Sequence, residues 1–201
     1  MVMLQVFHQF IPVLLAGFLV NLQIGAAAVV IAVSLGVPLA LLRRRVAVAS
    51  RLIRTCIGLM QAMPTYVVMF FALTVLPRDL AVFGLPVAGM TAVVLAQSVY
   101  LTAYVAEDAH EALGHIARND HEHALLFLPN LLRGFVVVVM SSGFGAAVGV
   151  SEAVSATMRQ AERLPALSDR IVLFGVTIVL FALPVGLLNV LIRRLIARLR
   201  R

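Results

Sequence analysis

Five stretches of this sequence are apolar enough and long enough to cross a lipid bilayer as helices. A bilayer core needs about 20 consecutive apolar residues in a helix. Apolar residues make up 62% of the 201 residues and charged residues only 12%, whereas a soluble domain carries roughly 45–50% and 25%. The expected spans cover residues 21–42, 57–76, 85–105, 135–150 and 171–192. A β-barrel would show polar alternation instead, so we expect an all-α integral membrane protein in which residues 1–201 form a single domain.

The arginines give these spans a direction. All 16 basic residues are arginine, and the net charge is +7. Two segments contain arginine but no acidic residue, one after the first span and one after the fifth: Arg43, Arg44, Arg45, Arg51 and Arg54, then Arg193, Arg194, Arg198, Arg200 and Arg201. The loops after the second and fourth spans balance arginine with acidic residues, as in Arg78 and Asp79. The positive-inside rule therefore places the N-terminus outside and the C-terminus in the cytoplasm, as five spans require.

Residues 106–134, between the third and fourth spans, are the polar exception and fall on the cytoplasmic side. Four of the five histidines lie here, namely His110, His115, His121 and His123. Histidine and carboxylate bind metals, but no two of these histidines have the i, i+4 spacing that places both on one helical face. We therefore expect no metal site in this loop, and we expect a short helix within it. A pH sensor, a solvated surface and a docking surface for a cytoplasmic partner are the interpretations left open.

Polar side chains within the spans indicate either a solute path or contacts between helices. Gln97, Tyr100 and Tyr104 follow an i, i+3, i+7 pattern and share one face of a helix. Such groups are costly in lipid, so they face a cavity or a hydrogen-bonding partner. Thr65 follows Pro64, which removes a helical hydrogen bond from the second span. Breaks of this kind occur in helices that line cavities, and a simple kink is the alternative.

The sequence lacks the residue patterns of an enzyme. It has no phosphate-binding P-loop, so the chain cannot hydrolyse ATP itself. Cys56, the one cysteine, lies in an apolar run with no histidine close to it in sequence. No serine stands in the context of a nucleophile elbow. We expect no catalytic residue and no cofactor bound by this chain.

Several segments resemble, in order along the chain, the permease subunits of polar amino acid ABC importers. Ala103-Tyr104-Val105-Ala106-Glu107 looks like the end of the third helix in that family. Arg118-Asn119-Asp120-His121-Glu122-His123-Ala124 lies where the family begins its EAA loop, the coupling helix that contacts the ATPase subunit. Gln61-Ala62-Met63-Pro64, Leu128-Pro129-Asn130-Leu131-Leu132-Arg133 and Val148-Gly149-Val150-Ser151-Glu152 are similar to three further family motifs.

The departures from the family pattern fall mainly in the coupling loop. His123 replaces the first Ala of Glu-Ala-Ala, and a stretch of the coupling region is missing before Leu128. Asn119 stands where the family has Gly, a replacement that is tolerated because Asn also adopts left-handed backbone geometry. Gln61 replaces an Arg of the second-helix motif.

The resemblance implies a type I ABC importer permease fold, multi-pass in the bacterial cytoplasmic (inner) membrane, that moves a polar amino acid or a related small solute. It implies three kinds of protein partner: a cytoplasmic ABC ATPase dimer that uses ATP, a second permease subunit (identical or different) and a periplasmic solute-binding protein. Membrane lipid surrounds the chain, and no nucleic acid is expected. The ATPase-coupling residues would be Arg118, Asp120, Glu122, His123 and Ala124. The substrate pathway would use Pro64, Thr65, Gln97, Tyr100 and Tyr104.

Two other functions are consistent with the sequence. A non-transporting wall or interaction subunit, paired with a competent sister permease, is favoured by the altered coupling loop. A membrane-bound enzyme would use the histidine-rich loop. The polar face of the third span opposes the first alternative, because a mere wall does not need it.

Overall fold

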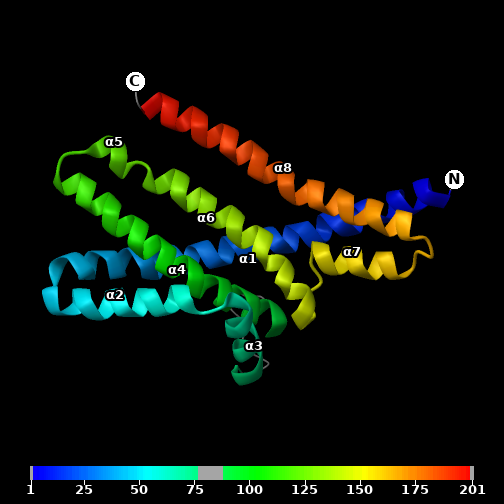
Figure 1. Ribbon diagram of the computed structural model, residues 1–201, viewed down its shortest axis with the longest axis horizontal. Helices are drawn as coiled ribbons and strands as arrows, with labels where there is room; N and C mark the ends of the chain where they lie inside the picture. The colour runs from blue at the N-terminus through cyan, green and yellow to red at the C-terminus, as the bar shows by residue number, and fades with distance from the viewer. Residues whose placement is uncertain (1, 77–87, 200–201) are drawn as a thin grey trace.

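The computed structural model describes residues 2–76 and 88–199, and all the regular elements in these two ranges are helices (Figure 1). They are α1 (Val2–Arg45), α2 (Ala47–Ala62), α3 (Thr65–Val75), α4 (Ala88–Ala117), α5 (His121–Ala124), α6 (Phe127–Ser141), the 3-10 helix η1 (Ser142–Val148), α7 (Ala153–Glu162) and α8 (Leu167–Leu199). The all-α architecture predicted from the sequence is confirmed for this part of the chain.

Helix α4 forms the centre of the bundle. Of the apolar 18-residue stretch in α4, 72% is buried inside the chain. The corresponding shares are 33% for α1 and 12% for α8. Helix α1 crosses α4 and packs against it more extensively than any other two helices pack (Figure 1). Small residues allow this approach: Ala28 and Ala32 are fully buried, and a Cβ added at Gly36 would lie 2.9 Å from Cγ1 of Val105. Close packing through small residues is how membrane helices associate without a hydrophobic driving force.

Four helical segments are long and apolar enough to cross a membrane: His8–Arg45, Ala88–Ala117, His121–Val148 and Leu167–Ile192. A fifth candidate is the pair α2 and α3, which is bent by 94° between its two halves. The described helices thus supply four spans, or five if the bent pair crosses the membrane as one.

The second predicted span is continuous in the sequence but broken in the structure. Pro64 has no backbone N–H and disfavours helical geometry at the residue before it. Met63 accordingly adopts an extended conformation (ψ 123°), α2 ends at Ala62, and α3 starts again at Thr65. The expected span 57–76 is therefore two helices with a sharp bend.

The predicted loop 106–134 is helical over most of its length. Helix α4 continues to Ala117, the single turn α5 follows, and α6 already begins at Phe127. A helix that extends beyond the lipid carries polar residues, so the end of an apolar run does not mark the end of the helix. The fourth span was expected at residues 135–150. Helix α6 instead begins at Phe127 and is followed by the 3-10 helix η1 at Ser142. Helix α7 has no counterpart in the prediction.

Some predictions fall on residues outside the described ranges. These are the balanced pair Arg78 and Asp79, the start of the third span at residue 85, and Arg200 and Arg201. The side chains of Arg193 and Arg198 also lie outside the description.

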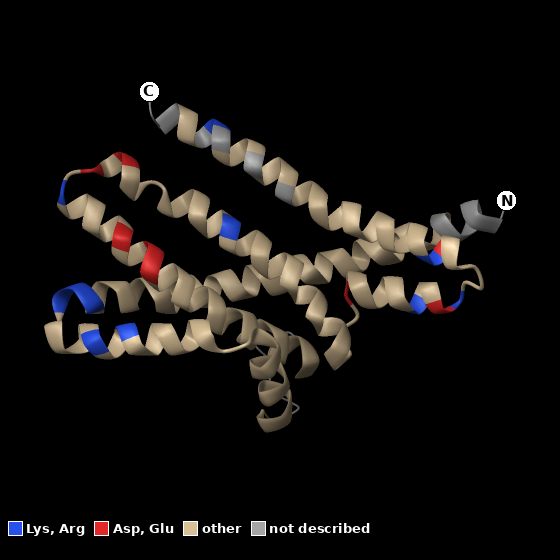
Figure 2. Cartoon of the chain, in the orientation of Figure 1, with Lys and Arg blue, Asp and Glu red and all other residues tan. Residues whose placement is uncertain are grey.

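Charged residues gather at two ends of the molecule, and the ribbon between them is mostly free of charge (Figure 2). One end holds the C-terminus of α1, the start of α2 and the junction of α4 with α5. The other end holds α7 and the start of α8. This segregation keeps most charges out of the hydrocarbon core, where each would cost several kcal/mol.

Candidate functional site

The candidate site is the tip of the hairpin between α4 and α6, defined here as residues 115–124. Helix α4 ends in a Schellman motif: Asn119 N donates to Ile116 O (3.0 Å) and Asp120 N donates to His115 O (2.9 Å). Asn119 occupies the left-handed position of this motif with φ 58°. Asparagine thus takes the geometry expected where the importer permeases have Gly, and the chain reverses within three residues.

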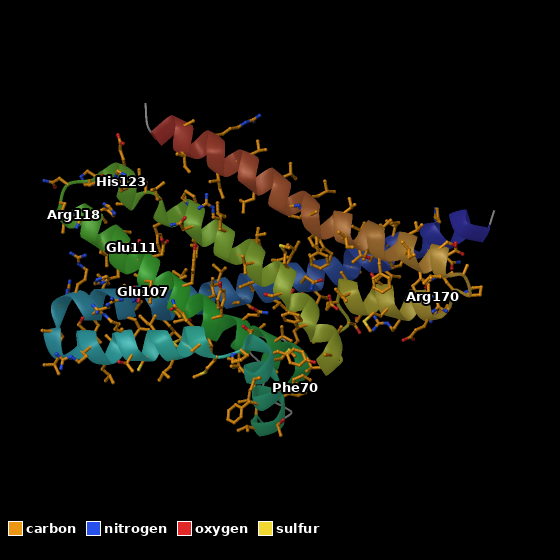
Figure 3. The ribbon with its side chains drawn as sticks, viewed as in Figure 1. Phe70, Glu107, Glu111, Arg118, His123 and Arg170 are labelled. Atoms are coloured by element: carbon orange, nitrogen blue, oxygen red, sulfur yellow. The ribbon has the colours of Figure 1, made fainter. Side chains whose placement is uncertain are left out.

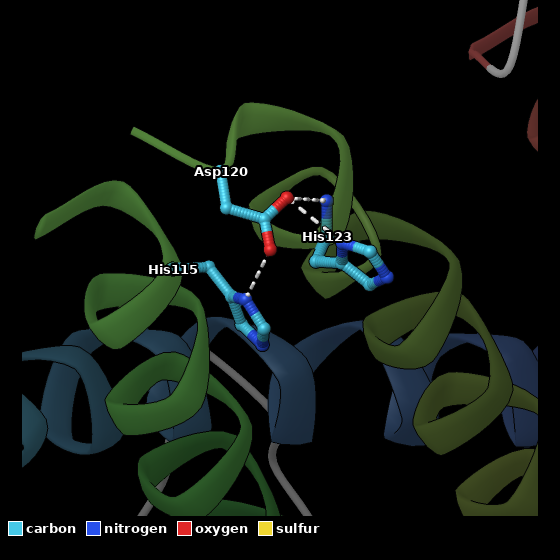
Figure 4. Close-up of side chains that lie close together, drawn as sticks. All are labelled: His115, Asp120 and His123. Carbon is cyan, nitrogen blue, oxygen red and sulfur yellow. Dashed lines mark hydrogen bonds and ion pairs between the residues drawn. The ribbon is translucent and has the colours of Figure 1, made fainter. Parts of the chain in front are cut away.

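Asp120 then caps the next helix and contacts two histidines. Its Oδ1 accepts a hydrogen bond from His123 N (3.4 Å), and this bond caps the start of the single-turn helix α5. The same Oδ1 lies 2.8 Å from Nδ1 of His123, and Oδ2 lies 2.9 Å from Nδ1 of His115 (Figure 4). The hydrogen bonds from His123 and His115 lower the pKa of Asp120 to about 2, so this carboxylate is ionised at any physiological pH.

The predicted coupling residues lie together on the tip. Arg118, Glu122 and His123 are exposed, whereas Asp120 and Ala124 are half-buried. Figure 3 shows Arg118 and His123 at the far end of the hairpin, beyond Glu107 and Glu111 on α4. The arrangement offers both signs of charge to a partner. It differs from an extended coupling helix in length, because α5 contains only four residues.

The predicted pathway residues contact other helices within the chain. Gln97 is 2% exposed, and Ser141 Oγ on α6 donates to its Oε1 at 3.1 Å. Tyr104 Oη donates to Asn130 O (3.3 Å), and Tyr100 packs on the cluster formed by α1, α4 and α6. These contacts are those of the packing interpretation that the sequence left open.

Pro64 and Thr65 lie elsewhere, at the bend between α2 and α3. Pro64 is exposed and Thr65 is half-buried. The two groups of predicted pathway residues therefore come from different elements: the bend on one side, and the α4 face against α6 on the other.

An ion pair between α1 and α4 was not predicted from the sequence. Arg43 Nη1 lies 2.8 Å from Oε2 of Glu107, with the arginine side chain 8% exposed and the glutamate side chain 37% exposed. Arg44 Nη1 also donates to His110 O at 3.3 Å. The sequence did contain a signal for this pair. An acidic residue lies at the polar end of one span, and an arginine cluster lies at the end of another. The pair fixes the end of α1 against α4 below the tip.

A second polar network lies near the opposite end and also went unpredicted. Glu152 is fully buried, and its Oε2 accepts from Asn21 Nδ2 (3.0 Å) and from Val154 N (2.8 Å). Its Oε1 accepts from Ser155 N (2.7 Å), so Glu152 caps the start of α7. Asn21 Nδ2 donates to Ser142 Oγ as well, and Asn21 Oδ1 accepts from Ala153 N. Burial raises the pKa of Glu152 above its ordinary value, although these donors oppose the rise.

A small polar pocket of about 90 Å³ lies beneath the tip. Asp108, Glu111, His115, His123 and Asn130 are among the residues that line it. Asn130 Nδ2 donates to Asp108 Oδ1 at 2.7 Å, whereas Asp108 Oδ2 has no hydrogen-bond partner within the described residues. The pocket is therefore lined by both carboxylates and imidazoles.

Comparisons with known proteins identify the fold. No protein-family model matches the chain, and no curated protein matches it in sequence. Among solved structures, it is similar to a chain of an amino acid ABC transporter crystallised with histidines, with a TM-score of 0.72 and 20% identity over 94% of this chain and 96% of that one. It is also similar to a chain of the MetNI methionine ABC transporter in an inward-facing form, with a TM-score of 0.67 and 15% identity over 95% and 98%. The chain has the fold of an ABC transporter permease, as the sequence resemblance predicts.

Proposed function

We propose that this chain is the permease subunit of an ATP-driven ABC importer that moves a polar amino acid or a related small solute across the bacterial cytoplasmic membrane. The observation that carries the proposal is the agreement in fold over 94% of this chain and 96% of an amino acid transporter chain. The agreement extends over nearly the whole of both compared chains.

The proposed mechanism assigns the tip to coupling. A cytoplasmic ATPase dimer would contact Arg118, Glu122 and His123, which are exposed, while Asp120 holds the turn in place. The ion pair between Arg43 and Glu107 would then pass movement of the tip to α1, because it joins α4 to the end of that helix. The partners in this proposal are the ATPase dimer, a second permease subunit and a periplasmic solute-binding protein.

A second permease subunit is proposed because one chain leaves apolar helix surface uncovered. Only 12% of the apolar 18-residue stretch in α8 is buried within the chain. Lipid covers such a face in an isolated subunit, whereas a two-fold or pseudo-two-fold partner would enclose a pathway with it. We place the solute path at that subunit interface.

Co-purification with the ABC ATPase encoded nearest to its gene tests the coupling assignment. The wild-type chain should retain the ATPase in mild detergent, and Glu122→Arg should lose it, because an exposed negative charge at the tip is replaced by a positive one and charge complementarity with the partner is lost. Glu162→Arg is the matched control, since Glu162 is an exposed acidic residue at the end of α7, at the opposite end of the molecule. Equal retention by all three proteins would contradict the coupling role of the tip.

Transport separates a permease from a wall subunit. Proteoliposomes that contain the ATPase and this chain as the sole permease should take up a radiolabelled polar amino acid in an ATP-dependent manner, with a panel that includes histidine. The wall role would be assigned by two results together. Uptake would occur only when a different sister permease is added, and substitutions at Thr65 would leave that uptake unchanged. A membrane-bound enzyme would require the loop histidines, so transport retained after replacement of all four would exclude that alternative.

A further inference from the structure

Three side chains with metal-binding atoms converge at the tip from two different helices and the turn between them. His115 lies near the end of α4, Asp120 in the turn and His123 on α5, and one ligand atom from each lies within 4.8 Å of the others (Figure 4). The imidazole rings are nearly parallel, with centroids 5.2 Å apart and an interplanar angle of 20°. The spacing of the loop histidines along one helical face predicts no metal site, but the turn between α4 and α5 brings His115 and His123 together.

Local hydrogen bonds at the turn hold these three residues close together. The Schellman motif ties Asp120 N to His115 O, so the first two ligand residues are joined by a hydrogen bond of the main chain. The cap at the start of α5 uses a side chain instead: Asp120 Oδ1 accepts from His123 N (3.4 Å). A site whose ligand residues are already held by local hydrogen bonds loses less conformational entropy when it binds an ion.

We propose that His115, Asp120 and His123 bind a divalent transition-metal ion of the Zn²⁺ type. Two imidazole nitrogens and one carboxylate oxygen are a ligand set that such ions accept, at distances of about 2.0–2.2 Å, with a fourth position left for water or another ligand. Ligand atoms around a tetrahedral ion are then roughly 3.4 Å apart. The present Nδ1–Oδ separations of 2.9 Å (His115) and 2.8 Å (His123) are shorter than this, so both imidazoles would rotate away from Asp120 to admit an ion.

The surroundings of the proposed site carry both signs of charge. Arg118 Nη2 lies 3.4 Å from Nδ1 of His115 and would have to move away when an ion binds, whereas two carboxylates line the pocket beneath. Glu111 precedes His115 by one helical turn and, like Asp108, lines the pocket of about 90 Å³ beneath the two histidines. Asp108 Oδ2 is a buried carboxylate oxygen that accepts no hydrogen bond from any described residue. Both carboxylates favour a cation electrostatically. A bound ion would join α4 to α5 and stiffen the surface that carries Glu122.

Zn²⁺ binding to the purified full-length chain tests the site. Calorimetric titration in detergent would use an affinity tag without histidine and Cys56→Ser in every protein, because Cys56 is an exposed thiol that also binds Zn²⁺. We expect one Zn²⁺ per chain. His115→Asn, Asp120→Asn and His123→Asn should each weaken binding at least about tenfold, the loss that even residues outside the ligand shell produce. His121→Asn is the matched control, since His121 lies on the same turn outside the cluster and should bind as tightly as the parent.

Co²⁺ substitution provides a measurement that does not depend on the variants being folded. The parent chain with bound Co²⁺ should show the intense visible absorption of a tetrahedral ion with nitrogen and oxygen ligands. Absence of Zn²⁺ binding in the parent chain, or equal binding by His115→Asn, His123→Asn and His121→Asn, would overturn the proposal. These measurements need no ATPase, so their outcome is independent of whether the chain is a transporter subunit.

Discussion

Asn21 and Glu152 show how a single polar contact can fix two helices in an apolar protein. Glu152 is fully buried with donors on both carboxylate oxygens, and Asn21 on α1 supplies one of them. Asn21 Oδ1 also accepts from Ala153 N. The Asn21 amide thus bonds both to the capping carboxylate of Glu152 and to a backbone N–H of α7. Gly17, one turn before it, allows this approach, because an added Cβ would lie 2.7 Å from Ala153 N. The start of α7 is therefore held by polar contacts to α1 rather than by apolar area alone.

Replacing Asn21 should destabilise the chain in a way that depends on pH. Burial raises the pKa of Glu152, so its contribution to stability is present below the pKa of the unfolded chain and is lost as pH rises through the folded-state value. Asn21→Ala removes a donor to the ionised carboxylate and raises that pKa further. We expect a loss of about 2 kcal/mol at pH 8.5, the usual cost for a hydrogen bond to a charged group, and a smaller loss at pH 4.5.

The free energy of unfolding in detergent, measured across this pH range, checks the prediction. Gln23→Ala is the control, because Gln23 is an exposed residue on the same helix and should change stability little at either pH. A loss that is equal at both pH values would mean that Glu152 does not change its charge in this range, and would contradict the predicted pH dependence.

At the level of helices, the sequence predicted which segments are helical better than it predicted where they end. The apolar runs identify the centres of α1, α4 and α8 because only burial in lipid or protein explains twenty apolar residues in a row. Their ends are set by other causes. Helix α4 continues through Glu107, Asp108 and Glu111 to Ala117, where the left-handed Asn119 stops it.

The candidate site was only partly predictable for a related reason. The resemblance pointed to residues 118–124 as a surface for a partner, and the structure places them together on the tip. The approach of His115 to His123 depends on a backbone turn with one positive φ, which spacing along a single helix cannot reveal. The contacts of Asn21 with Glu152 cross 131 positions of sequence and have no local signal.

The bend between α2 and α3 should depend on Pro64. Its ring prevents a continuous helix, so Pro64→Ala should allow the two helices, now bent by 94°, to straighten. Spin labels on Cys56, which is exposed on α2, and on Val75→Cys at the end of α3 would report the change. At 1.5 Å per residue, the distance should rise from roughly 20 Å to roughly 28 Å.

A proline outside the bend provides the comparison for that measurement. Pro38→Ala alters a proline inside α1 and should leave the distance between the two labels unchanged. If Pro64→Ala also leaves it unchanged, packing of α3 on α4 rather than the proline holds the bend.

At the scale of the whole molecule, the two charged ends suggest how the chain lies in a membrane. The end of α1, with Arg43, Arg44 and Arg45, lies at the same end of the bundle as the tip (Figure 2). The positive-inside rule assigns that end to the cytoplasm. The start of α8, at the opposite end, would then face outward.

Cysteine labelling tests this orientation. In a Cys56→Ser background, Ser168→Cys should react with a membrane-impermeant maleimide in intact spheroplasts, because Ser168 is exposed at the start of α8. Glu122→Cys, exposed at the tip, should react only after the membrane is permeabilised. Labelling of Glu122→Cys in intact spheroplasts, with protection of Ser168→Cys, would reverse the orientation.

The length of α1 has a mechanical consequence for the bilayer. Its 44 residues correspond to about 66 Å of helix, roughly twice the thickness of a hydrocarbon core. An upright α1 would extend far into water on both sides, so hydrophobic mismatch favours a steep tilt. Its two prolines, Pro12 and Pro38, are separated by about 39 Å, close to the thickness of a bilayer with its headgroups. The intervening segment is thus a proline-free rod, and lipid thickness would set the angle at which it stands.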